Sequence, residues 1–585
     1  MTAAFRSQPD APEAWRRKAV LGLFGVFAIV IVGKAFMMQV VAPSDYNRQG
    51  DRQHIKTQEL RAHRGAVRDR HGEPLALSAP VMSITANPKK LLAEPRYIAA
   101  AEKVLQERPG ELTSYLKERD AQGLQQVYLR RWMNPDDAQR LAALKAPGVE
   151  IEPDYRRYYP AGEVAAHVVG FLDFEGKAMA GVERTADTAL SGAPGKRRVV
   201  RDKRRRVVED PEELKPATPG TDVQLTLDLR LQYLAYRELK AAVESNKAVG
   251  GLIVLADARS GDILALASQP GFNPNRSDLR EPEALRNRAV TMTFEPGSTI
   301  KPLMVAEALE ARVISPDYHV DTGNGTYKIA DVTVRDVHPA GDVDLTKLLA
   351  KSSNVGAAHI GWLMGAETMW TGYSRFGFGD PVRAGLPAES PTVLRDFHQW
   401  RPSDTVTASY GYSMTVNALQ LVRAYCALAN DGLMPALSVI ARPSAVPPQR
   451  VVSAHTAQLV RRMMEGVTTT GGTGTKAAVP GYRVAGKTGT VKKNENGRYL
   501  EGVHQSAFIG MMPAEHPELV ALVMIDEPGN GEYYGGAVSA PVFGRVMAGA
   551  ARLLQIKPDE MPPALPKSQQ VVDATAAPQI ARSRP

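Results

Sequence analysis

The chain has 585 residues, of which 44% are apolar and 23% are charged. This length exceeds what one hydrophobic core usually organises, so we expect two or more domains. The ordinary apolar and charged content excludes a fibrous or wholly disordered chain. The excess of 72 Lys and Arg over 63 Asp and Glu gives a net charge of +9, which suits an anionic surface such as a membrane, a cell-wall polymer or nucleic acid without choosing among them.

The amino-terminal segment carries the pattern of a membrane anchor. Arg16-Arg17-Lys18 precedes 23 mostly apolar residues, Ala19 to Val41, and about 20 residues are needed to cross hydrocarbon as a helix. The basic cluster predicts that residues 1–18 form a cytoplasmic tail and that the remainder is exported. A cleaved signal peptide is the alternative, because Val40-Val41-Ala42 offers small residues at plausible positions, but the apolar stretch is long for one. Lys34 either snorkels to the membrane surface or contacts a partner helix.

The exported part divides by composition into three regions. Residues 42–215 are rich in arginine and broken by short extended segments, with a helical stretch expected from Pro95 to Leu144. A charged, proline-rich linker, Asp210 to Asp222, marks the boundary. We expect a non-catalytic pedestal or dimerisation-type domain over 42–215, a catalytic domain over 216–556, and a disordered tail over 557–585.

The catalytic region has an α+β pattern. GGLIVLADARSGDILALAS predicts a strand, a turn at Ser260-Gly261 and a second strand. Helical patterns dominate from Lys301 to about Gly432, and strands return in YRVAGKTGTVKK, VHQSAFIGMMPA and ELVALVMIDEP. Strands at both ends with helices between them predict a mainly antiparallel sheet flanked by helices. The single cysteine, Cys426, falls in a helical pattern and is expected to be a buried, inert thiol.

One basic run, GKRRVVRDKRRRVV from Gly195 to Val208, raises a nucleic-acid hypothesis. Val199-Val200 and Val207-Val208 frame a polar turn near Asp202, which is typical of a solvated β-hairpin. Because an exported segment does not meet nucleic acid, we favour the hairpin and expect no nucleic-acid partner.

Two copies of Ser-x-x-Lys are present, a pattern that can mark a nucleophile with its own base. Ser114 and Lys117 lie among charged residues, so this lysine is expected to stay solvated and protonated. Ser298 and Lys301 lie among mostly uncharged residues, which favours burial and a lowered lysine pKa. Pro302 is tolerated only in the first turn of a helix, so the helix must begin close to Ser298. That start brings the Lys301 amine toward the Ser298 hydroxyl and leaves early backbone N–H groups ready to stabilise an oxyanion.

Two later strings complete a set. They are Ser352-Ser-Asn354 in AKSSNVGAA and Lys487-Thr-Gly-Thr490 in VAGKTGTVKK. The order S-x-x-K, S-x-N, K-T-G is the set described for serine penicillin-recognising enzymes. The Ser352 hydroxyl can relay a proton to the leaving amine, and the Asn354 amide can both donate to and accept from a substrate peptide.

The K-T-G string suits an edge strand that binds an extended peptide. Lys487 supplies a cation for a terminal carboxylate, and Thr488 and Thr490 add hydroxyls. Gly489 lets the peptide backbone approach closely, and the peptide can add along the strand edge. Lys487 near Lys301 would also keep the Lys301 amine neutral by repulsion. The alternative is structural: Ser352 and Asn354 as helix caps and K-T-G-T as a strand-edge turn.

Over nearly its full length the chain resembles the class B penicillin-binding proteins, most closely the FtsI-type division transpeptidases. The resemblance rests on the three motifs, on HRGAVRDRHGEPLA after the anchor, on RRYYPAGEVAAHVVGF from Arg156, and on MIDEPGNGEYYGGAVSAPVFGRVMAG near the end. It implies the penicillin-binding transpeptidase fold and a peptidoglycan D,D-transpeptidase that cross-links stem peptides at the division septum. An elongation-type transpeptidase, a β-lactam hydrolase or sensor on the same fold, and a catalytically inactive structural protein are the alternatives.

The resemblance also implies roles for individual residues. Ser298 would attack the carbonyl between the two terminal D-alanines with Lys301 as base, and the backbone N–H groups of Ser298 and Thr490 would form the oxyanion hole. Tyr533 and Tyr534 would border the active-site groove, and β-lactams would acylate Ser298 as substrate mimics. No metal or organic cofactor is implied, and the sequence contains no H-E-x-x-H and no paired Cys and His residues.

The implied setting is the bacterial inner membrane, with one span, a cytoplasmic N-terminus and a periplasmic catalytic domain. The pedestal would contact a SEDS-family glycosyltransferase (FtsW-like) and other division proteins.

Overall fold

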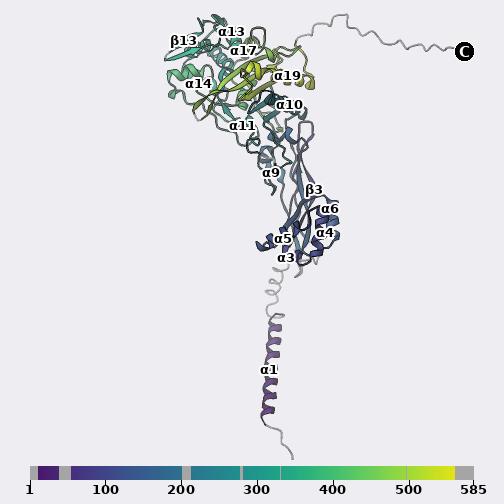
Figure 1. Cartoon of the computed structure of the whole chain (residues 1–585). Helices are drawn as coiled ribbons and strands as arrows, with labels where there is room; N and C mark the ends of the chain where they lie inside the picture. The colour runs from purple at the N-terminus through teal and green to yellow at the C-terminus, as the bar shows by residue number, and fades with distance from the viewer. Residues whose placement is uncertain are drawn as a thin grey trace, which may run out of the picture. The chain divides into compact units, whose positions relative to one another are not determined.

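The computed structural model describes residues 11–38, 55–200, 212–276, 278, 281–329, 331–495 and 497–559 (Figure 1). The chain divides into two compact units. One comprises Met1–Arg64 with Ser191–Gly220, and the other comprises Gly65–Leu190 with Thr221–Pro585. The second unit therefore holds most of the predicted pedestal together with the catalytic region from Thr221 onward.

The first unit contains the apolar helix and a small sheet. Helix α1 (Ala11–Phe36) has a mean hydropathy of 2.3 over Trp15–Phe36, and none of that window is buried. It therefore has the length and composition of a membrane-spanning helix. The predicted span begins inside α1, and its last residues, 39–41, lie outside the described part of the chain.

The sheet of this unit has the order β1-β6-β7, with both pairs antiparallel. Its strands are β1 (Ile55–Leu60), β6 (Gly195–Val200) and β7 (Glu212–Lys215). The first half of the predicted basic hairpin is thus strand β6. The proposed turn and the second half, through Val207-Val208, lie outside the described residues.

In the second unit, residues 65–190 are organised around one long strand, β3 (Pro74–Ala86), which pairs antiparallel with three others. These are β2 (Val67–Arg68), β4 (Val127–Met133) and β5 (Val149–Tyr158). The helices beside the sheet are α3 (Pro88–Leu92), α4 (Pro95–Leu105), α5 (Glu111–Ala121) and α6 (Pro135–Ala143). Their buried leucines and isoleucines form a separate core with strands β3 and β4.

Strand β4 corrects one prediction, because the sequence was expected to be helical from Pro95 to Leu144. Val127 and Leu129 are buried, whereas Tyr128 and Arg130 are exposed. This period of two suits a half-buried strand, and pairing with β3 satisfies its backbone.

The catalytic region is built on a five-stranded antiparallel sheet of order β10-β9-β21-β20-β19, as the sequence predicts. The strands are β9 (Gly250–Asp257), β10 (Ile263–Gln269), β19 (Ala485–Glu495), β20 (Arg498–Met512) and β21 (Leu519–Asp526). Strand β19, which carries the K-T-G motif, ends this order and presents a free edge among the described strands. Strands β9, β10 and β21 are almost entirely buried, because helices cover both faces of the sheet.

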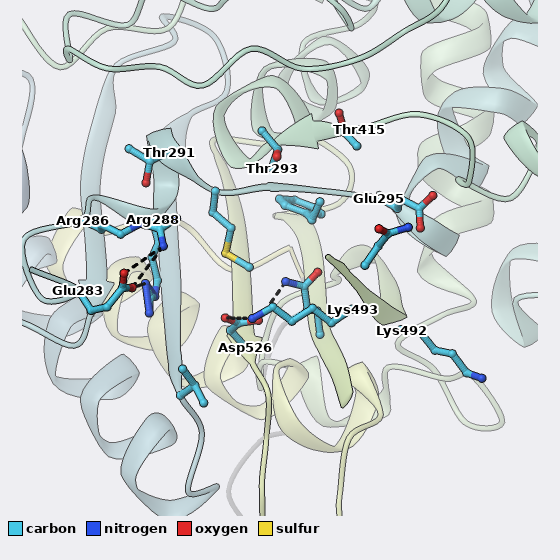
Figure 2. Close-up of a pocket in the computed structure, with 15 residues that line it drawn as sticks. Glu283, Arg286, Arg288, Thr291, Thr293, Glu295, Thr415, Lys492, Lys493 and Asp526 are labelled. Carbon is cyan, nitrogen blue, oxygen red and sulfur yellow. Dashed lines mark hydrogen bonds and ion pairs between the residues drawn. The ribbon is translucent and has the colours of Figure 1, made fainter. Parts of the chain in front are cut away.

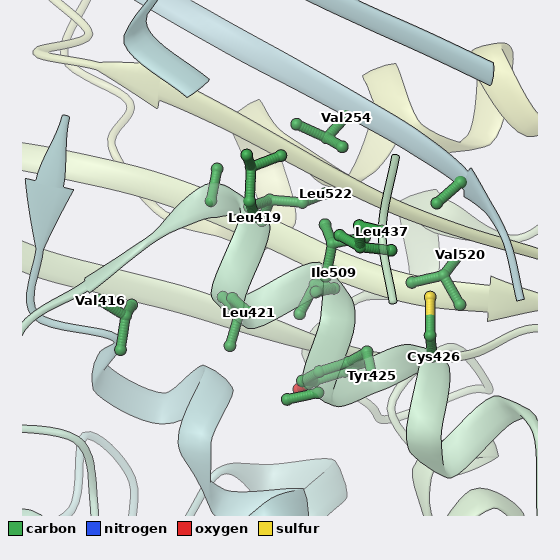
Figure 3. Packing of buried hydrophobic residues seen from close by; sticks show 14 of the residues in the cluster. Val254, Val416, Leu419, Leu421, Tyr425, Cys426, Leu437, Ile509, Val520 and Leu522 are labelled. Atoms are coloured by element: carbon green, nitrogen blue, oxygen red, sulfur yellow. The ribbon is translucent and has the colours of Figure 1, made fainter. Parts of the chain in front are cut away.

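Alternate residues along the strands pack against different helices. Ile253 and Leu255 lie in the core formed with α10 (Leu229–Ser245) and α19 (Ala540–Leu554). On the other face the sheet packs against α16 (Ala418–Ala429), as Figure 3 shows for Val254, Val520 and Leu522.

Cys426 projects from α16 into this core and is fully buried (Figure 3). Burial raises the pKa of its thiol, so the thiol stays protonated and unreactive, as predicted from the helical pattern.

The remaining helices of this region surround the motifs. They are α11 (Arg288–Thr291), α12 (Lys301–Glu310), α13 (Leu345–Lys351), α14 (Asn354–Arg375), α15 (Pro402–Ala408), α17 (Ala454–Glu465) and α18 (Gly535–Val538). Helix α19 lies in the segment Gly535–Leu554, which is long and apolar enough to span a membrane. However, 61% of its apolar window is buried, so α19 is a core helix of the globular domain.

Candidate active site

Ser298 lies in a 3₁₀ turn, Gly297–Ile300, that runs directly into α12. Pro302 occupies the first turn of α12, so the helix begins where the sequence predicts. Gly297 has φ +53°, and a Cβ at this position would lie 2.3 Å from Val491 Cγ1 on β19. Glycine is therefore required twice over, by the backbone conformation and by the close approach to the sheet edge. Tyr425 of α16 stabilises the turn, because its hydroxyl donates to the Thr299 carbonyl oxygen at 2.7 Å.

Lys301 is completely buried, and its amine is bound by the S-x-N motif. Nζ donates to the Ser352 carbonyl oxygen at 2.7 Å and to Asn354 Oδ1 at 2.7 Å, and it lies 3.3 Å from Ser352 Oγ. Among the described residues, no hydrogen bond reaches Ser298 Oγ. The expected proximity of the amine to Ser298 therefore rests on their shared helical turn, while the direct contacts of the amine are with the S-x-N motif.

The charge state of Lys301 follows from this burial. Desolvation lowers its pKa from 10.5 to about 7, and the Asp336 carboxylate opposes this effect by favouring the charged form. A substantial fraction of the amines is therefore neutral near pH 7 and able to take a proton.

Asp336 is a residue that the sequence did not single out. Its carboxylate accepts hydrogen bonds from the backbone N–H groups of Asn354 and Val355 and from Ser353 Oγ. It follows strand β14 (Val332–Arg335) and belongs to no motif, so only the fold brings it to the start of α14.

Ser352 lies between the two lysines. Its Oγ is 3.3 Å from Lys301 Nζ and accepts from Lys487 Nζ at 2.9 Å. Ser352 has φ +58°, a left-handed conformation that is uncommon outside glycine and ends α13. The next residue, Ser353, is the one that caps α14, accepting from Gly356 N at 2.9 Å. The side chain that caps α14 is therefore that of Ser353, and the Ser352 hydroxyl contacts the two lysine amines instead.

The side chain of Asn354 is fixed in orientation. Its Oδ1 accepts from Lys301 and its Nδ2 donates to the Arg335 carbonyl at 3.0 Å. An amide nitrogen carries two hydrogens, so one N–H remains available for a substrate.

Lys487 is also completely buried, and its Nζ donates to Ser352 Oγ and to the Thr488 carbonyl at 3.1 Å. Desolvation, followed by repulsion from Lys301, lowers its pKa well below the ordinary value. The predicted repulsion between the two amines is thus present, and the pKa that it lowers is that of Lys487. Burial therefore favours the neutral Lys487 amine, and an arriving carboxylate would favour its charged form.

The other residues of the K-T-G string make close contacts with neighbouring segments. A Cβ on Gly489 would lie 2.8 Å from Thr299 Cγ2, so the nucleophile turn packs directly on this glycine. Thr488 Oγ1 bonds to Thr473 Oγ1 at 2.9 Å, and Thr490 Oγ1 accepts from Gly535 N at 2.9 Å.

Tyr533 and Tyr534 immediately precede α18 and lie beside the same strands. The two rings stack with centroids 4.6 Å apart, and Tyr533 stacks on His504 of β20 at 4.1 Å. Ser506 Oγ donates to the Tyr533 carbonyl oxygen, which ties this segment to β20. His504 was not predicted, because only strand pairing brings it next to Lys492 and the tyrosines.

The second Ser-x-x-Lys pattern takes no part in this site. Ser114 and Lys117 are exposed on α5, and Ser114 Oγ donates to the Gly110 carbonyl of its own helix at 3.0 Å.

Comparison with known families gives two matches. Residues 251–548 match the model of the penicillin-binding protein transpeptidase domain, and residues 59–225 match that of the penicillin-binding protein dimerisation domain. The peptidoglycan D,D-transpeptidase FtsI of Escherichia coli K12 is 37% identical over 558 residues, covering 94% of this chain and 93% of that protein. PenA of Neisseria gonorrhoeae is 39% identical over 542 residues, covering 92% and 93%.

Solved structures agree. The transpeptidase domain of penicillin-binding protein 3 from Burkholderia pseudomallei has 37% identity and a TM-score of 0.53, covering 58% of this chain and 98% of that one. Penicillin-binding protein 3 from Mycobacterium tuberculosis, solved with aztreonam, has 27% identity and a TM-score of 0.67, covering 86% and 98%.

Proposed function

Because this chain belongs to the penicillin-binding protein family of peptidoglycan D,D-transpeptidases, we propose that it cross-links stem peptides at the division septum through an acyl-enzyme on Ser298. The observation that carries the proposal is the buried Lys301 amine, bonded to Ser352 and Asn354 and with a pKa lowered to about 7. A structural lysine would need neither complete burial nor this network.

In the proposed acylation step, Ser298 Oγ attacks the carbonyl carbon between the two terminal D-alanines while its proton passes to neutral Lys301. The backbone N–H groups of Ser298 and Thr490 stabilise the negative charge on the carbonyl oxygen. The C–N bond then breaks, and the nitrogen of the leaving D-alanine takes a proton from Lys301 through Ser352 Oγ, which lies 3.3 Å from the amine. The products are free D-alanine and an ester on Ser298.

In the second step an amine from a neighbouring stem attacks the ester carbonyl. It gives up a proton by the same route, Ser298 regains its hydrogen, and an amide cross-link forms. During both steps Lys487 and Thr488 bind the carboxylate of the donor, while Asn354 and the edge of β19, through Gly489 and Thr490, bind its backbone. Tyr533 and Tyr534 border the groove.

A peptide thioester donor tests this reaction directly. We expect the wild-type chain, supplied with a D-alanyl thioester and a D-amino acid, to release thiol and form the corresponding amide, and the Ser298→Ala variant to form none. Thiol release by Ser298→Ala at the wild-type rate would refute the assignment. A fluorescent penicillin that labels the protein and is lost within seconds would instead indicate a β-lactam hydrolase.

The septal role rests on the resemblance of the sequence motifs to the FtsI-type division transpeptidases, and the alternative is an elongation-type transpeptidase. A fluorescent fusion distinguishes them: accumulation at midcell supports the septal role, and accumulation along the side wall contradicts it.

We further propose the membrane arrangement and domain limits expected from the sequence. Residues 1–18 are cytoplasmic, 19–41 span the inner membrane, 42–215 form a pedestal, 216–556 form the periplasmic transpeptidase domain, and 557–585 are a tail. The apolar, unburied helix α1 supports the span. The pedestal and span are the parts available to a SEDS-family glycosyltransferase and other division proteins.

A further inference from the structure

The second unit contains one cavity beside the active site and another outside it. Figure 2 shows the cavity at the end of β19, to which Lys492 and Glu295, three residues before the nucleophile, contribute side chains. That cavity adjoins the site already described. The other cavity has a volume of about 600 Å³ and is lined by residues between Glu107 and Phe174, contributed largely by β4 and α5. This volume is typical of a small-ligand site, and none of the lining residues belongs to the three motifs.

Three aromatic rings surround the guanidinium of Arg131 in this cavity. Arg131 Cζ lies 4.9 Å from the ring centroid of Tyr128, 5.1 Å from that of Trp132 and 4.6 Å from that of Phe174. Contacts between a guanidinium and aromatic faces are attractive. Arg131 Nη1 also donates to the Phe174 carbonyl oxygen at 2.5 Å, which fixes the loop that carries this ring. The rings are therefore held in position before any ligand binds.

Two of these rings are exposed although they are large and apolar. Tyr128 is 43% and Phe174 59% exposed, and the neighbouring Leu124 is exposed as well. A patch of exposed apolar side chains beside polar ones is typical of a binding surface. The third ring, Trp132, has φ +58° and lies 5.1 Å from the Phe174 ring. A bulky residue in this left-handed conformation is strained, and such strain is concentrated at functional sites.

The arginines of the cavity already have counter-charges. Arg130 lies 3.4 Å from Glu107, and Arg131 lies 3.4 Å from Asp154. Arg119 lies 3.9 Å from its neighbour on α5, Glu118. A phosphate or a carboxylate would have to compete with these pairs, so the balance of charge favours an uncharged ligand.

The same side chains keep hydrogen-bonding groups for such a ligand. Arg130 uses Nη2 to donate to the Leu105 carbonyl at 2.8 Å and to Glu107, and a guanidinium carries five N–H donors. Gln126 Nε2 donates to Thr85 Oγ1 at 2.8 Å, and among the described residues no donor reaches Gln126 Oε1. The cavity therefore offers both donors and an acceptor beside the exposed rings.

The backbone edge of β4 is poorly suited to bind an extended peptide. The strand pairs only with β3 among the described strands, and a free edge can accept a further strand. However, the Tyr128 carbonyl already accepts from the Tyr115 hydroxyl at 3.1 Å, and Trp132 departs from strand geometry. These two features interrupt the ladder that an added strand would need. The side chains are thus the part of β4 that is available to a ligand.

We propose that this cavity binds the glycan strand of peptidoglycan, by stacking uncharged N-acetylamino sugars on Tyr128 and Phe174. The C–H face of a sugar ring is apolar and weakly positive, which suits the negative face of an aromatic ring. The acetamido group offers a carbonyl to Arg130, an N–H to Gln126 Oε1 and a methyl group to Leu124. Because the exposed rings leave the cavity open to solvent, a polymer longer than the cavity can pass along it. The choice of this glycan rests on the proposed function, since the stem peptides are attached to it.

Isothermal titration calorimetry on the purified full-length protein tests this site. The probe is chitotetraose, an uncharged oligomer of N-acetylglucosamine without any peptide, and we expect saturable binding. Maltotetraose, a glucose oligomer that lacks acetamido groups, should bind at least about tenfold more weakly, the effect of losing about one hydrogen bond. Chitobiose should also bind more weakly than chitotetraose, because a polymer site contacts more than two rings. Equal affinities for chitotetraose and maltotetraose would overturn the amino-sugar class, and equal affinities for chitotetraose and chitobiose would overturn the polymer.

Tyr128→Leu and Phe174→Leu each replace one ring by another apolar side chain, and we expect each to weaken chitotetraose binding about fivefold to tenfold. Tyr158→Leu is the matched control, since Tyr158 is an exposed tyrosine of β5 that does not line the cavity; it should keep the wild-type affinity. Penicillin labelling at the wild-type rate in all three variants would show that they are folded.

Absence of chitotetraose binding to the wild type, or wild-type affinity in both cavity variants, overturns the glycan site, while penicillin labelling still supports the proposed function. Chitotetraose binding that is weakened by both cavity variants, in a protein that no penicillin labels, supports the saccharide site and overturns the proposed function.

Discussion

Replacing Asp336 by asparagine should shift the pH dependence of acylation to lower pH. Burial lowers the Lys301 pKa from 10.5 to about 7, and Asp336 is the group that works against this effect. Near pH 7 about half of the Lys301 amines are neutral, roughly a thousand times the fraction for a solvated lysine. Removing the Asp336 charge removes a nearby anion that favours the ammonium, so the neutral base persists to lower pH.

The assay is the second-order rate of labelling by a fluorescent penicillin between pH 5.5 and 9. For the wild type we expect the rate to rise about tenfold per pH unit below the midpoint near 7 and to level off above it, as for a single essential base. For Asp336→Asn we expect the same shape with its midpoint at lower pH.

Asp336 also binds the start of α14, so a control must separate its charge from its structural contacts. Ser353→Ala removes the neutral cap of the same helix and leaves the Asp336 charge in place. We expect this variant to melt at lower temperature, with a loss of about 1 kcal/mol in stability, and to keep the wild-type midpoint. A flat wild-type profile, or a midpoint that moves to higher pH in Asp336→Asn, would refute the reasoning.

Two further predictions concern packing and stability. Gly489→Ala places a Cβ 2.8 Å from Thr299 Cγ2, and displacing the nucleophile turn should slow penicillin labelling about 10- to 100-fold; labelling at the wild-type rate would show that the turn moves without consequence. His167 is buried and its Nε2–H donates to the Ala284 carbonyl oxygen at 2.8 Å, and burial lowers its pKa from 6.5 to about 4. The unfolded chain therefore binds a proton that the folded chain does not between these two values, and stability falls as the pH drops from 6.5 to 4, by about 3 kcal/mol for this residue. His167→Gln should reduce that loss, measured as the difference in melting temperature between pH 7 and pH 4.5; an equal loss in the variant would contradict it.

Much of the catalytic region could be predicted because its patterns are local. Strands β9 and β10 follow from two apolar runs joined by the turn at Ser260-Gly261, and the helix start at Ser298 follows from Pro302. The motif residues Lys301, Ser352 and Lys487 also meet, as expected from the presence of all three motifs in order, although they are far apart in the sequence.

Other features depend on contacts between distant segments and left no local pattern. Asp336 reaches Asn354 only through the loop after β14, and His504 meets Tyr533 where Ser506 of β20 binds the Tyr533 carbonyl oxygen. Strand β4 lies between two helices in the sequence, which favours a prediction of helix. Its pairing with the distant strand β3 makes it a strand.

The most direct test of the central assignment is to map the acyl adduct. Purified full-length protein is incubated with a penicillin, digested, and analysed by mass spectrometry. We predict one penicilloyl adduct, on the peptide that contains Ser298, and none on the peptide that contains Ser114. An adduct on any other residue, or an adduct that persists in Ser298→Ala, would contradict the assignment of Ser298 as the nucleophile.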